Sequence, residues 1–132
     1  MKVLFVCLGN AFRSPVAEAL LKKFRTEIKV DSAGISPSIP ISEAARKYLA
    51  RENAQQFLKQ TPESINEKDL DKYDLIIAME PRHKDIVVSK CPECKNKIVV
   101  WKIDDPYFLP QGYTEKIFKQ IKDKVAELVN SL

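Results

Sequence analysis

The chain lacks the features that mark several broad classes of protein. No apolar run approaches the roughly 18 residues that a membrane-spanning helix needs, and no basic run suggests nucleic-acid binding. His83 is the one histidine, which excludes a two-histidine metal motif and leaves a serine–histidine triad without obvious support. Three cysteines, an odd number, favour free thiols or a transient disulfide over the disulfide framework of a small secreted domain.

The start of the chain also lacks a convincing secretion signal. Its apolar run, Val3–Leu8, is short, and Arg13 follows soon after. The composition is ordinary, with 45% hydrophobic residues, 30% charged residues and a net charge of +4 that is spread along the chain. We therefore expect one domain over residues 1–132, located in the cytoplasm as a monomer or weak dimer. We expect no metal, cofactor, membrane or nucleic acid as its partner.

Glycine is scarce, and its three positions fall where the chain should turn: Gly9, Gly34 and Gly112. Four short apolar stretches predict strands. They are Val3–Leu8, Ile28–Ser32, Asp74–Met79 and Lys97–Lys102. The first is a continuous apolar run with β-branched members, which is typical of a central strand that is covered on both faces.

Helical spacing of apolar residues separates these strands. It predicts helices over Ser14–Arg25, Ser42–Arg51 and Glu80–Ser89, a brief helix from Asn66 towards Asp71, and a last helix. Ser14, Ser42 and Thr114 are the expected N-caps. The alternation predicts a three-layer α/β/α fold with a central four-stranded parallel sheet and a phosphate-binding loop after the first strand. Ligands then bind beyond the carboxyl ends of the strands.

Five residues separate Cys7 from Arg13 in the turn between the first strand and the first helix. A loop of this length can point its backbone N–H groups at one spot, and a helix N-terminus adds to the attraction for an anion. The guanidinium of Arg13 offers a planar fork that matches two phosphate oxygens. The same field favours the reactive thiolate of Cys7. A buried, inert cysteine is the alternative, but it leaves this combination unexplained.

The nine residues Cys7–Pro15 resemble the signature of the low-molecular-weight protein tyrosine phosphatases, which has cysteine, five residues, arginine, serine and usually proline. The resemblance continues through Ser32-Ala33-Gly34, Asp74–Met79 and Asp105-Pro106-Tyr107. It implies a four-stranded parallel sheet flanked by helices. It also implies hydrolysis of a phosphomonoester in two steps, without a metal.

The resemblance assigns roles to individual residues. Cys7 would attack phosphorus while Asp105 protonates the leaving oxygen, and Asp105 would then activate the water that releases inorganic phosphate from the cysteinyl-phosphate. Arg13 and the loop amides would hold the phosphate oxygens. Ser14 would hydrogen-bond the sulfur, and Asn10 would brace the loop. The implied phosphate- and substrate-binding residues are Leu8, Gly9, Asn10, Ala11, Phe12, Arg13, Ser14 and Tyr107. Asp104 is the rival acid, but it lacks the Pro-Tyr that follows Asp105.

Two departures from the family pattern bear on protection and substrate. Phe12 stands where many relatives have a second cysteine, so Cys7 lacks a neighbouring thiol for a protective disulfide. The loop Ile35–Pro40 has no aromatic residue, although relatives that act on phosphotyrosine often have one there. Tyr107, Phe108 and Phe12 remain as candidate aromatic walls. The expected substrate is a phosphorylated protein or an aryl phosphate, with protein-tyrosine phosphatase as the leading hypothesis.

Two other activities remain open. Protein-arginine phosphatases are similar but tend to have threonine at the position of Ala11, where alanine decides nothing. A thiol-dependent arsenate reductase would use Cys7 together with Cys91 and Cys94, although the spacing of this pair is shorter than in those enzymes. Cys91-Pro92-Glu93-Cys94 is also compatible with half a zinc site or with a surface turn whose thiols oxidise together. His83 is expected on the surface of its helix.

Overall fold

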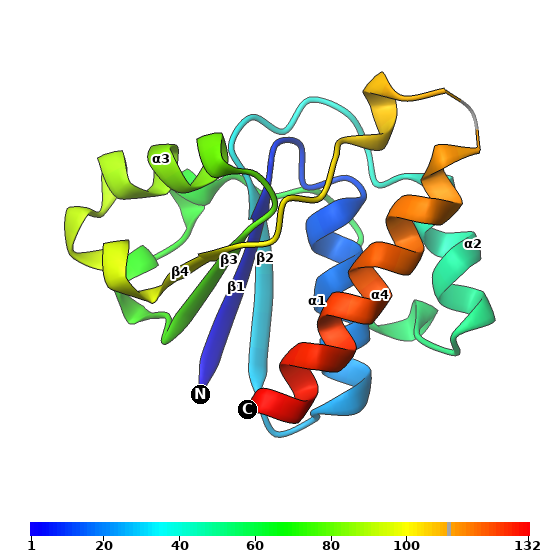
Figure 1. The fold of residues 1–132 in the computed structure, drawn as a ribbon, viewed down its shortest axis with the longest axis horizontal. Coiled ribbons are helices and arrows are strands. Elements are labelled where there is room, and N and C mark those ends of the chain that lie inside the picture. The colour runs from blue at the N-terminus through cyan, green and yellow to red at the C-terminus, as the bar shows by residue number, and fades with distance from the viewer. Residues whose placement is uncertain (111) are drawn as a thin grey trace.

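Four parallel strands form one sheet in the order β2-β1-β3-β4 in the computed structural model, which describes residues 1–110 and 112–132, without the side chain of Phe108 (Figure 1). The strands are β1 (Lys2–Cys7), β2 (Lys29–Gly34), β3 (Leu75–Ala78) and β4 (Ile98–Val100). The helices are α1 (Arg13–Phe24), α2 (Glu43–Arg51), α3 (Pro81–Lys90) and α4 (Tyr113–Ser131). Short 3₁₀ turns lie between them: η1 (Gln55–Phe57), η2 (Ile65–Glu67), η3 (Leu70–Lys72), η4 (Pro92–Lys97) and η5 (Pro106–Phe108).

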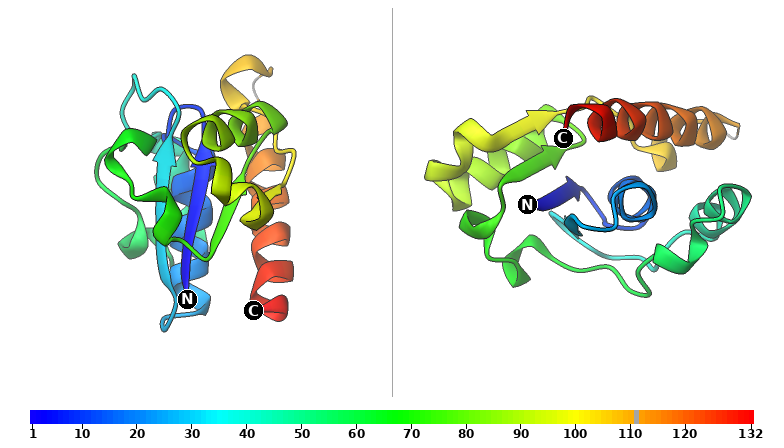
Figure 2. Two further views of the ribbon diagram at one scale, coloured as in Figure 1. Left: turned by 90° about the vertical axis from the view of Figure 1, so that its left-hand side faces the viewer. Right: turned by 90° about the horizontal axis from the view of Figure 1, so that it is seen from below.

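Helices cover both faces of the sheet (Figure 2). Alternate residues of β1 point into two separate apolar clusters, because successive side chains of a strand face opposite ways. Val3 and Phe5 join the cluster that includes residues of α1, α2 and α4. Leu4 and Val6 join the cluster that includes residues of α3 and of η2, η3 and η4. The predicted three-layer fold is confirmed, and the continuous apolar run of β1 follows from burial on both faces.

The parallel register brings the loops after the strands to one edge of the sheet. Val6 pairs with Ala33 of β2 and with Ala78 of β3. Beyond the strand ends, the amide of Ser36 donates to the carbonyl of Leu8 (2.8 Å). The loop that follows Cys7 is therefore tied to the loop that follows β2.

The four predicted strands and the four longer helices form, but several of their ends differ. β2 continues to Gly34, and β4 ends at Val100, because Lys102 has a left-handed φ of 56° that turns the chain away. Two 3₁₀ turns, η2 and η3, replace the brief helix expected from Asn66 towards Asp71. Within residues 1–110 and 112–132, no helix has both the length and the apolar character needed to cross a membrane.

One of the three expected N-caps forms. The hydroxyl of Ser42 accepts from the amide of Ala44 at the start of α2, as predicted. The prediction for Ser14 is wrong, because α1 begins at Arg13 and the Ser14 hydroxyl turns towards the preceding strand instead. The prediction for Thr114 is also wrong, since Gly112 occupies the cap position of α4 with a φ of 104°.

Candidate active site

The loop between β1 and α1 encloses the sulfur of Cys7. This cysteine is free and buried, and its sulfur lies 2.9 Å from the hydroxyl of Ser14. The backbone amide of Asn10 donates to the same sulfur (3.2 Å). Asn10 has a left-handed φ of 53°, a conformation that asparagine adopts more readily than most residues. Both contacts tie the sulfur to the loop that follows β1.

The side chain of Asn10 is fully buried and holds the loop in this shape. Its amide nitrogen donates to the hydroxyls of Ser14 (2.8 Å) and Ser32 (3.0 Å). Its oxygen accepts from Lys59 Nζ and from the backbone amide of Glu63, both at 2.8 Å. These four bonds use the full donor and acceptor capacity of the side chain. The bracing role expected for Asn10 therefore has a physical basis in the structure.

Lys59 is a member of this network that the sequence did not reveal. Besides its bond to Asn10, its ammonium donates to the carbonyl of Ser32 (2.9 Å) and pairs with Glu63 (2.8 Å). Burial would raise the pKa of Glu63, but hydrogen bonds from Lys59 and Lys68 hold that pKa below its usual value. Lys59 lies in no recognisable motif, so only the tertiary structure links it to the loop.

Close approach of two loops explains Gly34, at the end of β2. A Cβ added to Gly34 would lie 2.9 Å from backbone atoms of Leu8, Gly9 and Asn10. Such contacts are shorter than real Cβ atoms show, and backbone cannot swing aside as a flexible side chain can. Glycine at this position lets the Cys7 loop rest directly on β2.

Arg13 is buried between two carboxylates. Its Nη1 donates to Glu80 (2.6 Å) and to the carbonyl of Ile103 (2.7 Å). Its Nη2 lies 3.5 Å from Asp105 Oδ2. Burial would raise the pKa of Glu80, but the hydrogen bond and charge of Arg13 hold it below its usual value. Glu80 is not among the site residues predicted from the sequence. Its position directly after the apolar residues of β3, at the ligand-binding edge, was the available signal.

Asp105 reaches the site from the loop after β4. Its Oδ1 accepts from the amide of Tyr107 (3.0 Å) and so caps the turn η5, which leaves Oδ2 on the side of Arg13. Asp104 is exposed and does not line the pocket described below. The structure thus separates the two neighbouring aspartates, and it brings Asp105, but not Asp104, to the arginine.

A pocket of about 150 Å³ opens above the sulfur. An apolar cavity of about that volume holds a benzene-sized molecule, so the space suits one phosphate group and the atoms next to it. The pocket is lined by Cys7, Leu8, Gly9, Ala11, Phe12, Arg13, Ser36, Ser38, Ile39, Asp105, Pro106 and Tyr107. Six of the eight residues expected to bind phosphate or substrate line it. Asn10 and Ser14 do not, because their side chains lie behind the loop and support it.

Tyr107 and Ile39 form the exposed rim of the pocket, with 54% and 41% of their surface exposed. Burial and the charge of Asp105 raise the pKa of Tyr107. Phe12 lines the pocket, but it is 3% exposed and packs edge-on against Tyr48 in the core. The expectation for Phe108 lies outside the described residues. Tyr107 is the exposed aromatic side chain among the described residues of the pocket.

His83 is not on the helix surface, so that prediction is wrong. It is 1% exposed, and neither ring nitrogen has a hydrogen-bond partner within the part of the chain that the structure describes. Its Nε2 lies 3.6 Å from Glu80. Burial and the guanidinium of Arg13 lower the pKa of His83 to about 4. Val87, four residues later, is also buried, so both side chains lie on the inward face of α3.

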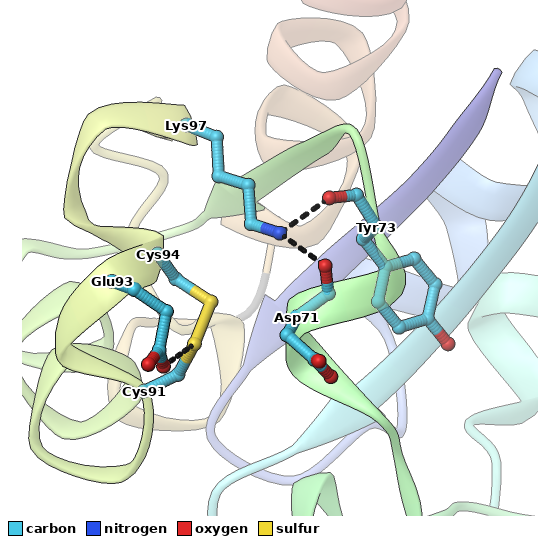
Figure 3. The surroundings of a disulfide bond; sticks show 6 residues. All are labelled: Asp71, Tyr73, Cys91, Glu93, Cys94 and Lys97. Carbon is cyan, nitrogen blue, oxygen red and sulfur yellow. Dashed lines mark hydrogen bonds between the residues drawn. A yellow bond between two sulfur atoms is a disulfide. The ribbon is translucent and has the colours of Figure 1, made fainter.

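Cys91 and Cys94 form a disulfide, as expected for thiols that oxidise together. The pair is buried rather than on the surface, with 3% and 0% exposure. Figure 3 shows it beside Lys97, which donates to the carbonyls of Asp71 and Tyr73. Those two residues precede β3, whereas Cys7 ends β1. The disulfide therefore lies towards the amino ends of the strands, away from the pocket.

Comparison with known proteins places this geometry in context. The family model for low molecular weight phosphotyrosine protein phosphatase matches residues 2–132. The low molecular weight protein-tyrosine-phosphatase Wzb of Escherichia coli (strain K12) is 34% identical over 119 residues, covering 80% of this chain and 77% of that protein. The protein-arginine-phosphatase of Bacillus subtilis (strain 168) is 30% identical over 147 residues, covering 100% of this chain and 94% of that protein.

Solved structures give the same result. The tyrosine phosphatase amsI of Erwinia amylovora superposes with a TM-score of 0.89 at 26% identity, covering 99% of this chain and 92% of that chain. The low molecular weight protein tyrosine phosphatase from T. tengcongensis gives a TM-score of 0.87 at 31% identity, covering 100% of this chain and 99% of that chain.

Proposed function

The chain belongs to the low molecular weight phosphotyrosine protein phosphatase family, and on that premise we propose that it hydrolyses phosphotyrosine in proteins through a cysteinyl-phosphate on Cys7. The observation that carries this proposal is the shared pocket. Cys7, Arg13 and Asp105 line one small cavity at the carboxyl ends of the strands. A nucleophile, a cation and a carboxyl group around one phosphate-sized space are the parts that such a reaction needs.

In the first step, the thiolate of Cys7 attacks phosphorus and the bond to the leaving oxygen breaks. The loop amides and Arg13 hold the three other phosphate oxygens, where charge is spread in the transition state. Asp105 arrives protonated and gives its proton to the leaving oxygen. Glu80 and the carbonyl of Ile103 fix the guanidinium in place, so little reorganisation is needed when phosphate binds.

In the second step, Asp105 is ionised and takes a proton from water as that water attacks phosphorus. The phosphorus–sulfur bond breaks, and its electron pair returns to Cys7. The amide of Asn10 and the hydroxyl of Ser14 stabilise the departing thiolate through the contacts already present. The product is inorganic phosphate, and neither step requires a metal.

The rim of the pocket supports an aryl phosphate as substrate. Tyr107 and Ile39 stand at the mouth, where the ring of a phosphotyrosine can lie while its phosphate reaches Cys7. We propose that a phosphorylated protein is the physiological partner, and that residues 1–132 act as one domain in the cytoplasm, as a monomer or weak dimer.

A protein-arginine phosphatase is the second candidate. The protein-arginine-phosphatase of Bacillus subtilis (strain 168) is similar to this chain over the whole of the chain's length. Ala11 lines the pocket and leaves space beside the loop, which a guanidinium could use. An arsenate reductase in which Cys91 and Cys94 exchange directly with Cys7 is less well supported, because the pair lies near the opposite end of the strands.

Turnover of a chromogenic aryl phosphate with a metal chelator present tests the proposal. Cys7→Ser should abolish turnover, and Asp105→Asn should lower kcat by ~10²-fold to 10⁴-fold. Asp104→Asn is the matched control, expected to stay within about twofold because Asp104 does not face the pocket. Turnover that survives in Cys7→Ser, or that falls equally in both aspartate variants, contradicts the mechanism. Phosphotyrosine and phosphoarginine peptides then separate the two substrates.

A further inference from the structure

The disulfide pair takes no part in the proposed phosphatase chemistry, and the turn that contains it is held by other bonds. The amide of Cys91 donates to the carbonyl of Val87 (2.8 Å), at the end of α3. The amide of Cys94 donates to the carbonyl of Cys91 (2.9 Å). These backbone bonds do not depend on the sulfur–sulfur bond. After reduction, the two thiols would therefore stay close enough to form the disulfide again.

The two sulfurs differ in access. Both residues are buried, with 3% and 0% exposure, but Cys91 lines an open pocket of about 490 Å³ and Cys94 does not. Thiol exchange needs a sulfur that a second thiolate can approach, so Cys91 is the reachable partner. The pocket wall carries both signs of charge, with Lys90 on one side and Asp69 and Asp71 among the acids. Such a wall suits a small thiol that has its own ammonium and carboxylate groups.

Glu93 gives the reduced state a favourable contact. Its Oε1 lies 2.7 Å from Cys91 Sγ (Figure 3). A disulfide sulfur has no proton, so in the oxidised form two atoms with lone pairs face each other. When Cys91 is a thiol, its S–H can donate to the carboxylate, which makes the same contact attractive. Glu93 therefore stabilises the reduced pair relative to the disulfide.

We propose that Cys91 and Cys94 form a thiol–disulfide exchange site, in which Cys91 reacts with small charged thiols. A thiolate of this class bonds to Cys91 Sγ, the sulfur–sulfur bond breaks, and its electron pair goes to Cys94, which takes a proton from solvent. A second thiolate attacks the bound small-molecule sulfur and releases Cys91. Cys91 then takes a proton and donates to Glu93. Two small thiols become one disulfide as the protein disulfide becomes a dithiol, and the reverse reaction oxidises the pair.

The full chain with Cys7→Ser tests this proposal, because the pair is then the sole source of thiol and no phosphatase activity is needed. Equilibration with reduced and oxidised glutathione, followed by alkylation and intact-mass measurement, should show reversible conversion between disulfide and dithiol in the folded protein. With Cys94→Ser added, Cys91 should form a mixed disulfide with oxidised glutathione. With Cys91→Ser added instead, Cys94 should react at least ~tenfold more slowly.

Glu93→Gln tests the contact, with Asp85→Asn as the control. Asp85 is an exposed acid on α3, so its variant removes the same charge without touching the pair. Glu93→Gln should shift the glutathione equilibrium towards the disulfide by ~tenfold, whereas Asp85→Asn should leave it unchanged. The proposal is overturned if the pair reacts only after unfolding in urea, if Cys94 traps glutathione faster than Cys91, or if both acid variants behave alike.

Discussion

Two buried cysteine regions lie towards opposite ends of the same sheet, and their neighbours set them apart. Around Cys7, an amide, a hydroxyl and, across the pocket, a guanidinium supply positive or donating groups. At Cys91, the carboxylate of Glu93 lies 2.7 Å from the sulfur, which is bonded to Cys94. For the functions proposed above, the first setting suits attack on a bound anion, and the second suits pairing with another thiol. Position in the fold, rather than residue type, therefore distinguishes these two buried sulfur sites.

The two regions are connected by α3. Glu80 is the N-cap residue of this helix and accepts a hydrogen bond from Arg13, and Cys91 is its C-cap residue. His83 and Val87 lie between them on the buried face. Experiments that alter one end while measuring the other show whether the two sulfur sites are independent.

Among the variants that keep both Cys7 and Asp105, the largest effect is expected from Arg13→Lys, which removes the donating group that most distinguishes the Cys7 region. Lysine cannot hold Glu80, the Ile103 carbonyl and a phosphate at once, because it lacks the planar fork. We expect kcat/KM for an aryl phosphate to fall by ~10³-fold. Arg82→Lys is the control, since Arg82 also contacts Glu80 but is exposed. Equal losses in the two variants would show that only the salt bridges to Glu80 matter.

A pH-dependent loss of stability is expected from His83, between the two regions. Its folded-state pKa of about 4 lies below its usual 6.5, so the unfolded chain binds the proton first as the pH falls. Stability should drop by about 3 kcal/mol between pH 6.5 and pH 4 from this group. Arg13 and Arg82 oppose protonation, and Glu80 and Asp105 favour it. Urea unfolding at several pH values measures how the free energy of unfolding depends on pH, and His83→Met should weaken that dependence. An unchanged dependence in His83→Met would show that other groups cause it.

Much of the fold and most of the candidate site follow from the sequence, for identifiable reasons. The apolar run of β1 predicts a strand that is buried on both faces, and Cys7 to Arg13 is a contiguous motif. Glu80 and Lys59 belong to the same site, but they are 67 and 49 positions from their partners Arg13 and Asn10. The local pattern places Glu80 at the ligand-binding edge, but it does not pair Glu80 with Arg13, and it gives no sign of Lys59.

The wrong cap predictions have a similar cause. Ser14 has the residue type of an N-cap and stands before Pro15, yet its hydroxyl bonds the Cys7 sulfur, so tertiary contacts override the local preference. Thr114 lost the cap position to Gly112, whose left-handed φ starts α4 earlier. Both errors occur next to loops at the ligand-binding edge, where local rules are most often broken.

Reduction of the disulfide should lower stability without affecting catalysis. The disulfide joins residues that are three positions apart in the sequence. In the chain-entropy model, closing a loop of this size lowers the entropy of the unfolded chain and so raises the free energy of unfolding by ~2 kcal/mol. We expect Cys91→Ser/Cys94→Ser to unfold at a lower urea concentration, with kcat/KM within about twofold of the native value. A large loss of turnover would mean that α3 couples the two regions.

The same double variant tests whether Cys91 and Cys94 protect Cys7 from irreversible oxidation. Phe12, rather than a cysteine, precedes Arg13, so excess peroxide should drive Cys7 past sulfenic acid to forms that thiols do not reverse. Activity after peroxide and then dithiothreitol should stay low in the native protein and in Cys91→Ser/Cys94→Ser alike. Full recovery in the double variant would contradict this expectation.

The smallest effect is expected from Lys59, which acts on Cys7 only through Asn10. Lys59→Met leaves the oxygen of Asn10 with one fewer donor and should lower kcat by ~tenfold, with little change in KM. Alkylation of Cys7 by iodoacetate at neutral pH should slow as well, which a loss of global stability alone would not produce. Lys59→Arg should recover part of both rates, and Lys47→Met, on exposed α2 surface, is the control. Equal behaviour of the Lys59 and Lys47 variants would remove Lys59 from the network.

The most direct test of the account is to trap the phosphorylated sulfur. An aryl phosphate with a good leaving group needs no acid in the first step, so Asp105→Asn should accumulate the intermediate while the second step is slow. Acid quench followed by intact-mass and peptide analysis should then find one phosphoryl group on Cys7, and none in Asp105→Asn/Cys7→Ala. A phosphoryl group on another residue, or steady turnover with Cys7 never modified, would contradict the central claim.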